Sequence, residues 1–253
     1  MAGAATVEKA IDVLFHLHDA KAALGVSEIG RALDLPKSSC HRLLSSLLGR
    51  ELVDRDERGR YRPGLALLSL GLGAQQREPV VSAARPVLER EVAEVGETVF
   101  LVSLRHGHLR VLDKVEGSGF LRAAPGVGDI VPAEVTAAGR LYAALGSSTP
   151  EPGEGGFPRL AEGEADEIVQ RGYATNRDAW IEGLSVLGVP IWQDCGPGQR
   201  ALAAVMAVAA ASPRFQRLGE EALAGRLLLA AEQVGERLSA SRTLRNPERS
   251  TDR

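Results

Sequence analysis

Cysteine, aromatic residues and long apolar runs are all scarce in this chain. Its 253 residues include two cysteines, and aromatic side chains make up 4%. Cys40 and Cys195 are far apart and match no metal-ligand spacing, so we expect neither a disulfide framework nor a zinc site. The longest apolar run, Ala201–Ala211, is well short of the roughly 20 residues that a membrane helix needs. Because residues 1–6 also lack a basic stretch before an apolar core, we expect a cytoplasmic protein without a membrane partner.

Catalytic and cofactor motifs are missing as well. Ser118 lies in Gly117-Ser118-Gly119, which is too short for a nucleophile elbow. Gly126 and Gly128 lack the third glycine of a dinucleotide fingerprint. His106 and His108 flank a glycine in a predicted turn, and no acidic or cysteine partner has metal-ligand spacing. We therefore expect no catalytic residue, metal ion or cofactor, and the chain is not predicted to be an enzyme.

The segment from Val26 to Arg62 has the pattern of two short helices followed by a charged hairpin. Ser27 suits an N-cap, and Glu28 would lie in the first turn, where the helix dipole favours an acidic side chain. Pro36 ends this helix and suits the start of another, which we expect to run from Lys37 to about Leu48. Strands at residues 52–53 and 60–62 would enclose the turn at 54–59. This order predicts a winged helix-turn-helix.

The second helix of this motif separates an apolar side from a polar side. At about 100° per residue, Cys40, Leu43, Leu44 and Leu47 share one side and should pack. The polar side carries hydroxyls that permit close approach to phosphate and an arginine that can bind a guanine edge or a phosphate. The predicted DNA-contacting residues are Ser27, Lys37, Ser38, Ser39, His41, Arg42, Ser45, Arg58, Arg60 and Arg62.

Charge supports a local DNA contact. Residues 36–62 contain seven basic and four acidic side chains, a net charge of +3, whereas the whole chain has −3. A basic surface on a mildly acidic protein fits a localised phosphate contact better than general nucleic-acid coating. Because the excess is small, we expect useful affinity to require dimerisation.

The rest of the chain predicts a second domain that mixes helices and strands, so the fold class is α+β. A helix after Thr6 with Val7, Ala10, Ile11, Leu14 and Leu17 at helical spacing would brace the helix-turn-helix. We expect further helices at residues 65–72, 80–95, 136–145 and 163–171, and one long helix or a pair of helices at 213–238. Strands are expected at 98–104, 109–115, 120–124, 184–192 and 201–211. Residues 149–156 should form a surface loop. The predicted parts are a DNA-binding domain (1–63), a helical linker (64–78), a second domain (79–240) and a disordered tail (241–253).

Several motifs carry a resemblance to a known family. They are Leu35-Pro36-Lys37-Ser38-Ser39-Cys40-His41-Arg42-Leu43-Leu44, Gly59-Arg60-Tyr61-Arg62, Leu112-Asp113-Lys114-Val115-Glu116, Arg171-Gly172-Tyr173-Ala174 and Glu182-Gly183. In this order, from about Thr6 to Leu238, the chain resembles the IclR family of bacterial transcriptional regulators. The resemblance implies an N-terminal winged helix-turn-helix, a helical linker used in dimerisation and a C-terminal GAF-like effector-binding domain. It also implies that the protein binds double-stranded operator DNA as a homodimer or a dimer of dimers.

The resemblance further implies an effector pocket in the C-terminal domain. Its departures from the family pattern include Glu134 in place of a frequent histidine, Val186 in place of a cysteine and Arg140 in place of a lysine. Because such changes remove polar groups from the pocket, we expect a bulkier or more apolar effector than a small keto acid; a pocket that binds nothing is the alternative. The predicted pocket residues are Leu121, Ile130, Ala137, Ala138, Asn176, Leu184, Val186, Ala207 and Ala209.

Two classes of function follow from these observations. The first is a sequence-specific DNA-binding transcriptional regulator whose operator binding is modulated by a small molecule. The second is a metabolite-binding module or enzyme in which the N-terminal helices serve only assembly. The basic wing and the exposed helix face favour the first, because no nucleophile, base and orienting group can be assembled for the second. The residues leave open the effector, the operator, the sign of regulation and the choice between dimer and tetramer.

Overall fold

Two compact units divide the chain between Ala74 and Gln75. The computed structural model describes residues 2–119, 125–146, 157–196 and 198–245. Each unit has its own hydrophobic core, one in the first unit and one on each face of a sheet in the second.

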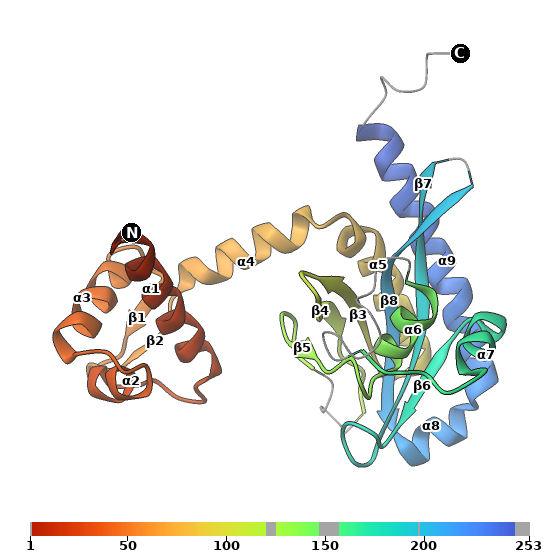
Figure 1. Ribbon diagram of the computed structural model, residues 1–253, viewed down its shortest axis with the longest axis horizontal. Helices are drawn as coiled ribbons and strands as arrows, with labels where there is room; N and C mark the ends of the chain where they lie inside the picture. The colour runs from red at the N-terminus through yellow and green to blue at the C-terminus, as the bar shows by residue number, and fades with distance from the viewer. Residues whose placement is uncertain (1, 120–124, 147–156, 197, 246–253) are drawn as a thin grey trace. The chain divides into compact units, whose positions relative to one another are not determined.

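The first unit packs three helices and a small antiparallel hairpin together and ends within a further helix, α4 (Leu65–Arg77) (Figure 1). Its elements are α1 (Ala2–Asp19), α2 (Val26–Ala32), α3 (Lys37–Leu48), β1 (Val53–Arg55) and β2 (Tyr61–Pro63). Strands β1 and β2 pair with Asp54 opposite Arg62, and Leu24 adds a bridge to Tyr61. Val13, Ile29, Leu44 and Val53 are buried together, so the helices and the hairpin share one core.

The start of α2 differs from the sequence prediction. Gly25 is its N-cap, with extended backbone, and Ser27 lies inside the first turn. Glu28 takes over the capping role, because its carboxylate accepts the backbone N–H of Gly25 at 2.6 Å. The expected α3 was confirmed from Lys37 to Leu48, with Pro36 at the N-cap position.

Helices α1 and α4 each expose several large apolar side chains. The first helix packs against the core through Val13 and Leu17, with Ala10 and Leu14 beside them, as expected for a bracing helix. Val7, Ile11 and Phe15 are exposed, so Val7 and Ile11 were wrongly counted among the bracing residues. Helix α4 (Leu65–Arg77) is longer than expected and has no buried residue. Its large exposed side chains are Leu65, Leu68, Leu70 and Leu72.

The second unit is built on a six-stranded antiparallel sheet in the order β5-β4-β3-β8-β7-β6 (Figure 1). Its strands are β3 (Thr98–Arg105), β4 (His108–Val115), β5 (Ile130–Val131), β6 (Ala174–Arg177), β7 (Leu184–Gly196) and β8 (Gln199–Ala211). Its helices are α5 (Pro79–Val95), α6 (Ala137–Leu145), α7 (Glu164–Arg171), α8 (Ser212–Leu218) and α9 (Glu220–Arg245).

Helices cover both faces of this sheet. On one face, α5 and α9 bury Leu88, Leu227 and Val234 against strand residues that include Leu101 and Leu187. On the other face, α6 and α7 bury Leu141 and Ile168 against Phe100 and Val205. Because both faces are covered, the central strands β3, β7 and β8 are apolar on both sides and appear in the sequence as continuous apolar runs.

Several element boundaries differ from the expected ones. The β7–β8 hairpin extends to Gly196 and Gln199. Of the two arrangements expected over residues 213–238, the chain forms the pair of helices, because Gly219, with a positive φ of 78°, separates α8 from α9. Helix α9 continues to Arg245, so residues 241–245 of the expected tail are helical; extending an existing helix costs far less than nucleating one. The remaining tail, residues 246–253, the strand expected at 120–124 and the loop at 149–156 lie outside the described residues.

Candidate nucleic-acid interface and effector cavity

Helix α3 presents the polar face that its sequence predicted. Cys40, Leu44 and Leu47 are buried on the side toward the core. The predicted DNA-contacting side chains on this helix are Lys37, Ser38, His41, Arg42 and Ser45, which are exposed, and Ser39, which is half-buried; Ser27 is exposed on α2. The helix therefore presents these polar side chains on one side, away from the core.

Internal contacts of α3 leave that surface free. Ser45 Oγ lies 3.4 Å from His41 Nδ1 and Ser46 Oγ donates to the carbonyl of Arg42, but the Arg42 guanidinium makes no ion pair within the described residues. On the opposite side, Cys40 Sγ donates to the carbonyl of Val26 at 3.6 Å. Burial raises the pKa of the Cys40 thiol, which keeps it protonated for this contact.

The turn of the wing is organised by one carboxylate. Asp56 Oδ1 accepts the backbone N–H groups of Arg58 at 3.0 Å and Arg60 at 2.8 Å. Gly59 has a positive φ of 76°, a conformation that side chains disfavour, and it completes the turn. The wing is therefore a preformed loop whose residues point in defined directions.

The arginines of the wing have different roles. Arg60 donates from Nε to the carbonyl of Ala23 at 2.7 Å and pairs with Glu28 at 3.1 Å, so it attaches the wing to α2. Arg62 pairs with Asp54 at 3.6 Å, and Arg55 lies over the Tyr61 ring. Within the described residues, the guanidinium of Arg58 has no such partner. The sequence prediction gave Arg58, Arg60 and Arg62 the same role, whereas the fold engages only Arg60 and Arg62 in internal contacts.

A small cavity lies between the sheet and α6 in the second unit. Its volume is about 20 Å³, enough for a water molecule and little more. Five of the predicted pocket residues line it: Ala137, Ala138, Asn176, Val186 and Ala207. Its other lining residues, absent from the prediction, are Phe100, Val102, Val131, Thr136 and Trp180.

The remaining predicted pocket residues lie elsewhere. Ile130 is 50% exposed, and its neighbour Val131 faces the cavity instead, because successive strand residues point to opposite sides. Leu184 and Ala209 are buried in the adjoining core without lining the cavity. Leu121 lies outside the described residues. Phe100 and Val102, which the prediction missed, are two residues apart on β3 and therefore point to the same face of the sheet. This spacing could have indicated that both line the cavity.

Asn176 is the polar group of this cavity that lacks a partner. Its side chain is 4% exposed, and its Oδ1 is buried without a hydrogen bond within the described residues. The other polar lining residue, Thr136, caps α6 by accepting the N–H of Gly139 at 3.2 Å. Buried polar atoms are ordinarily hydrogen-bonded, so an unpaired acceptor at a cavity marks a position for a donor from a water or from another bound molecule.

The wall that α6 forms is held close to the preceding loop. A Cβ atom at Gly139 would lie 1.8 Å from the carbonyl oxygen of Ala133. Because no side chain fits there, the glycine allows the first turn of α6 to pack on that carbonyl. The contact sets the position of Ala137 and Ala138, and hence the size of the cavity.

Other motifs from the sequence are structural. His106 and Gly107 both have positive φ, 51° and 80°, and form the two-residue turn of the β3–β4 hairpin. Where the chain is described, no group of three or more His, Cys, Asp or Glu side chains could hold a metal ion. None of the described helices is long and apolar enough to cross a membrane.

Two family models match the chain. The first lies within the first unit, and the second begins two residues before the second unit starts. The model of the IclR helix-turn-helix domain matches residues 6–57. The model of the bacterial transcriptional regulator IclR C-terminal domain matches residues 73–150. The matches include α2, α3 and the first strand of the wing, and in the second unit β3, β4, β5 and α6, but not the strands β6, β7 and β8 that complete the cavity.

Named relatives and solved structures extend this similarity to most of the chain. The chain is 29% identical to the HTH-type transcriptional regulator KipR of Bacillus subtilis over 83% of this chain and 87% of KipR. It is 28% identical to the HTH-type transcriptional regulator TtgV of Pseudomonas putida over 89% of this chain and 90% of TtgV. The fold is similar to that of Thermotoga maritima IclR, with a TM-score of 0.74, 22% identity and coverage of 92% and 98% of the two chains. An IclR homologue from Microbacterium hydrocarbonoxydans, complexed with 4-hydroxybenzoate, has a TM-score of 0.70 at 21% identity over 93% and 99%.

Proposed function

The chain belongs to the IclR family of bacterial transcriptional regulators, and we propose that it binds its operator as a homodimer controlled by a neutral, largely apolar effector. It is a DNA-binding regulator with an effector-binding C-terminal domain, not an enzyme. One observation carries the effector class: the unpaired Asn176 oxygen in an otherwise mainly apolar cavity.

For DNA, we propose that α3 enters the major groove. Ser38, Ser39 and Arg42 would contact base edges or phosphates, and Arg58 of the wing would contact the backbone or the minor groove. The exposure of the α3 polar face supports these roles, as does the lack of an ion pair at Arg42 and Arg58 in the part of the chain that the structure describes. Arg60 is assigned to positioning the wing, since its guanidinium already bonds Ala23 and Glu28.

For assembly, we propose that a second copy of the chain covers the apolar side chains of α1 and α4. Leu65, Leu68 and Leu72 recur at positions i, i+3 and i+7 and are 69%, 57% and 46% exposed. Phe15 of α1 is 64% exposed. Such a stripe on a helix without buried residues needs a partner, and an identical copy supplies a matching stripe. Dimerisation would also double the small local positive charge.

For the effector, we propose a molecule with an apolar body and one neutral hydrogen-bond donor. Phe100, Val102, Val131 and Val186 provide apolar contact, and Asn176 Oδ1 accepts the donor. A carboxylate is disfavoured because the cavity lining contains no cationic side chain. This supports a phenol or an aromatic alcohol over an anion.

Binding of such a molecule requires the cavity to enlarge. Its present 20 Å³ excludes an aromatic ring, so the effector would select a minor conformation in which α6 or Trp180 moves away from the sheet. The effector can change operator affinity only if it binds the two conformations unequally. A cavity that stays closed would make this chain a regulator without an effector, which is the alternative.

We propose the domain division 1–63 for DNA binding, 64–78 for the linker and 79–240 for effector binding. The boundary between the compact units lies within the proposed linker, in α4, whose side chains are not buried; this supports the division. A cytoplasmic location is part of the same proposal, because operator DNA is there.

The DNA part is tested with the full-length protein. Genomic fragments retained by the purified chain are sequenced, and the enriched fragment is titrated against random duplex over a range of salt concentrations. We expect the enriched fragment to bind at least about 10³-fold more tightly. Equal affinity for both duplexes would exclude a specific operator.

The effector part is tested by calorimetry with phenol and p-cresol as neutral probes and benzoate and 4-hydroxybenzoate as anionic probes. We expect the neutral probes to bind the wild type more tightly and Asn176→Leu to lose about tenfold in affinity. Thr175→Ala is the matched control, since its side chain lies on the opposite face of β6. Tighter binding of both anions, or equal losses in the two variants, would contradict the proposed effector class.

A further inference from the structure

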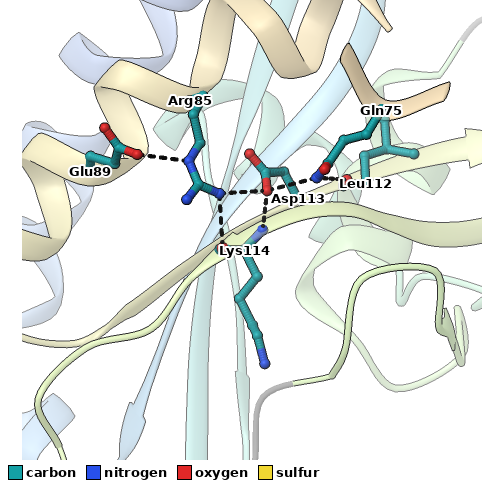
Figure 2. Close-up of polar contacts among 6 residues, drawn as sticks. All are labelled: Gln75, Arg85, Glu89, Leu112, Asp113 and Lys114. Atoms are coloured by element: carbon teal, nitrogen blue, oxygen red, sulfur yellow. Dashed lines mark hydrogen bonds and ion pairs between the residues drawn. The ribbon is translucent and has the colours of Figure 1, made fainter. Parts of the chain in front are cut away.

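Asp113 of β4 anchors the last turn of α4 to the sheet (Figure 2). Its side chain is 1% exposed, and Oδ1 accepts Gln75 Nε2 at 3.1 Å, Arg85 Nη1 at 2.9 Å and its neighbour's backbone N–H at 2.9 Å. Its other oxygen, Oδ2, is buried without a hydrogen bond in the described part of the chain. Gln75 in α4 and Arg85 in α5 thus share one acceptor across the junction of the two helices.

A second polar tether holds the same junction. Glu78 lies between α4 and α5 and is the N-cap residue of α5. Its Oε1 accepts Arg105 Nη2 at 3.0 Å, and Arg105 Nη1 donates to Ser103 Oγ at 2.6 Å. The side chains of Arg105 and Glu78 are 37% and 33% exposed, so the pair is only partly screened by water. Arg105, at the end of β3, therefore attaches the start of α5 to the sheet.

The second tether continues to α6. The backbone N–H of Leu104 donates to the hydroxyl of Tyr142 at 3.1 Å, and the same hydroxyl lies 3.5 Å from Ser103 Oγ. Tyr142 is 4% exposed, and burial is the main reason that its pKa is raised. It lies four residues after Ala138, one helical turn further along the same face, and Ala138 lines the cavity. A chain of polar contacts thus leads from Tyr142, one turn after the part of α6 that lines the cavity, to the α4–α5 junction.

We propose that Tyr142 and Arg105 are positioning residues that couple α6 to the α4–α5 junction. Movement of α6 would pull the Tyr142 hydroxyl away from the N–H of Leu104, and loss of a partner for this partly buried N–H group costs free energy. The adjoining Ser103 and Arg105 would then shift, and Glu78 with them. This proposal rests on the proposed function in one respect: effector binding in the cavity would cause the movement of α6. The coupling between α6 and the α4–α5 junction is present in the unliganded protein.

Hydrogen–deuterium exchange of the unliganded full-length protein tests the coupling. The amides of Val81 and Ser82 donate to the carbonyl of Glu78, so their exchange reports the start of α5. We expect Tyr142→Phe and Arg105→Gln to accelerate exchange in peptides from residues 76–82 by about three- to tenfold. Peptides from residues 184–191, in the centre of the sheet, serve as the internal reference and should keep their wild-type rates.

Arg214→Gln is the matched control. Arg214 also joins a helix to a largely buried carboxylate of the second unit, Glu97, at 2.6 Å, but among the described residues it makes no hydrogen bond or ion pair with residues 76–82. The coupling is wrong if Tyr142→Phe leaves these peptides unchanged, even where Arg105→Gln accelerates them. It is equally wrong if Arg214→Gln accelerates them to the same extent, since the effect would then be general loosening.

Arg105→Lys is a conservative second substitution at the same position, included in case Arg105→Gln fails to fold. Arg105→Lys keeps the charge but loses the forked geometry, so its exchange should lie between those of wild type and Arg105→Gln. Wild-type rates in Arg105→Lys and Arg105→Gln alike would overturn the tether. Because these measurements use neither an effector nor DNA, failure of the proposed effector class would leave their outcome unchanged.

Discussion

Arg60 Nη2 lies 3.1 Å from Glu28 Oε2 and joins the wing to the first helix of the helix-turn-helix. Arg60 also donates to the carbonyl of Ala23, and Glu28 also accepts the N–H of Gly25. Both side chains are about half exposed, so the pair is worth little as an isolated salt bridge. Its value lies in setting the direction of the wing.

Arg58 and Arg60 should therefore respond differently to the same substitution. Arg58→Gln is expected to lower the slope of log affinity against log salt by about 1 without changing stability. Arg60→Gln is expected to cost at most about 1 kcal/mol of unfolding free energy and to weaken DNA binding with an unchanged slope. Operator titrations across salt concentrations measure the slope, and thermal unfolding by circular dichroism measures the stability. Lys9→Gln of α1 is the control for both measurements. Identical slope changes in the two variants would contradict the division of roles.

Arg42→Ala should weaken operator binding by about 1–3 kcal/mol if the guanidinium reads a base, and it should relax preference at one operator position. The reason is loss of a forked donor pair that fits the guanine edge. Titration of operators mutated one base pair at a time provides the measurement. An equal loss on every duplex would identify Arg42 as a phosphate contact.

Phe15→Glu and Leu68→Glu should abolish self-association, because each places a charge in the proposed dimer interface. Sedimentation velocity of the purified variants should give a monomer, and operator affinity should fall by more than tenfold. Leu229→Glu is the control, since Leu229 on α9 is also 64% exposed. If Leu229→Glu gave a monomer and Phe15→Glu and Leu68→Glu did not, the dimer interface would lie on the second unit.

Gly139→Ala should destabilise the second unit by about 2 kcal/mol or more, because the added methyl would overlap the carbonyl of Ala133. Trp180 and Trp192 are the two tryptophans of the chain and both lie in that unit, so fluorescence during urea unfolding reports it selectively. Gly225→Ala in α9 is the control, because a Cβ there meets nothing within 4 Å. It should be neutral or stabilising by up to about 1 kcal/mol.

Tyr142 should make stability fall at high pH. Burial raises its pKa above the ordinary value of 10.0, so the folded state keeps the phenol proton that the unfolded state releases. The contribution is fully present below pH 10 and is lost as pH rises from there through the folded-state pKa. The tryptophan-monitored unfolding free energy should decline less between pH 9 and pH 11 in Tyr142→Phe than in wild type. Parallel declines would show that the phenol does not contribute.

Much of the local structure followed from residue patterns. Pro36 and the spacing of Cys40, Leu44 and Leu47 predicted the bounds and the buried face of α3, because a helix of 3.6 residues per turn places those side chains together. The apolar runs predicted the central strands. The two-residue β5 and four-residue β6 were missed, since segments so short carry too few residues for a period to be visible.

The cavity was predictable only in part. The resemblance indicated Ala137, Ala138, Asn176, Val186 and Ala207, but it could not show which neighbour faces inward at Ile130. That choice depends on the register of β4 with β5, in which Leu109 lies opposite Val131. The volume of the cavity depends on the close approach of α6 to Ala133, which no pattern in the sequence expresses.

By itself, the sequence determined the helix-turn-helix, its polar face and the mixed second domain, because these follow from periodicity and turn residues within short segments. Only the tertiary structure decided which wing arginine is committed to Glu28, which apolar side chains of α1 and α4 are exposed, and how Tyr142, Arg105 and Glu78 are connected. These relationships join residues tens of positions apart. Their distances are set by packing, and charge or hydrophobicity along the chain does not encode them locally.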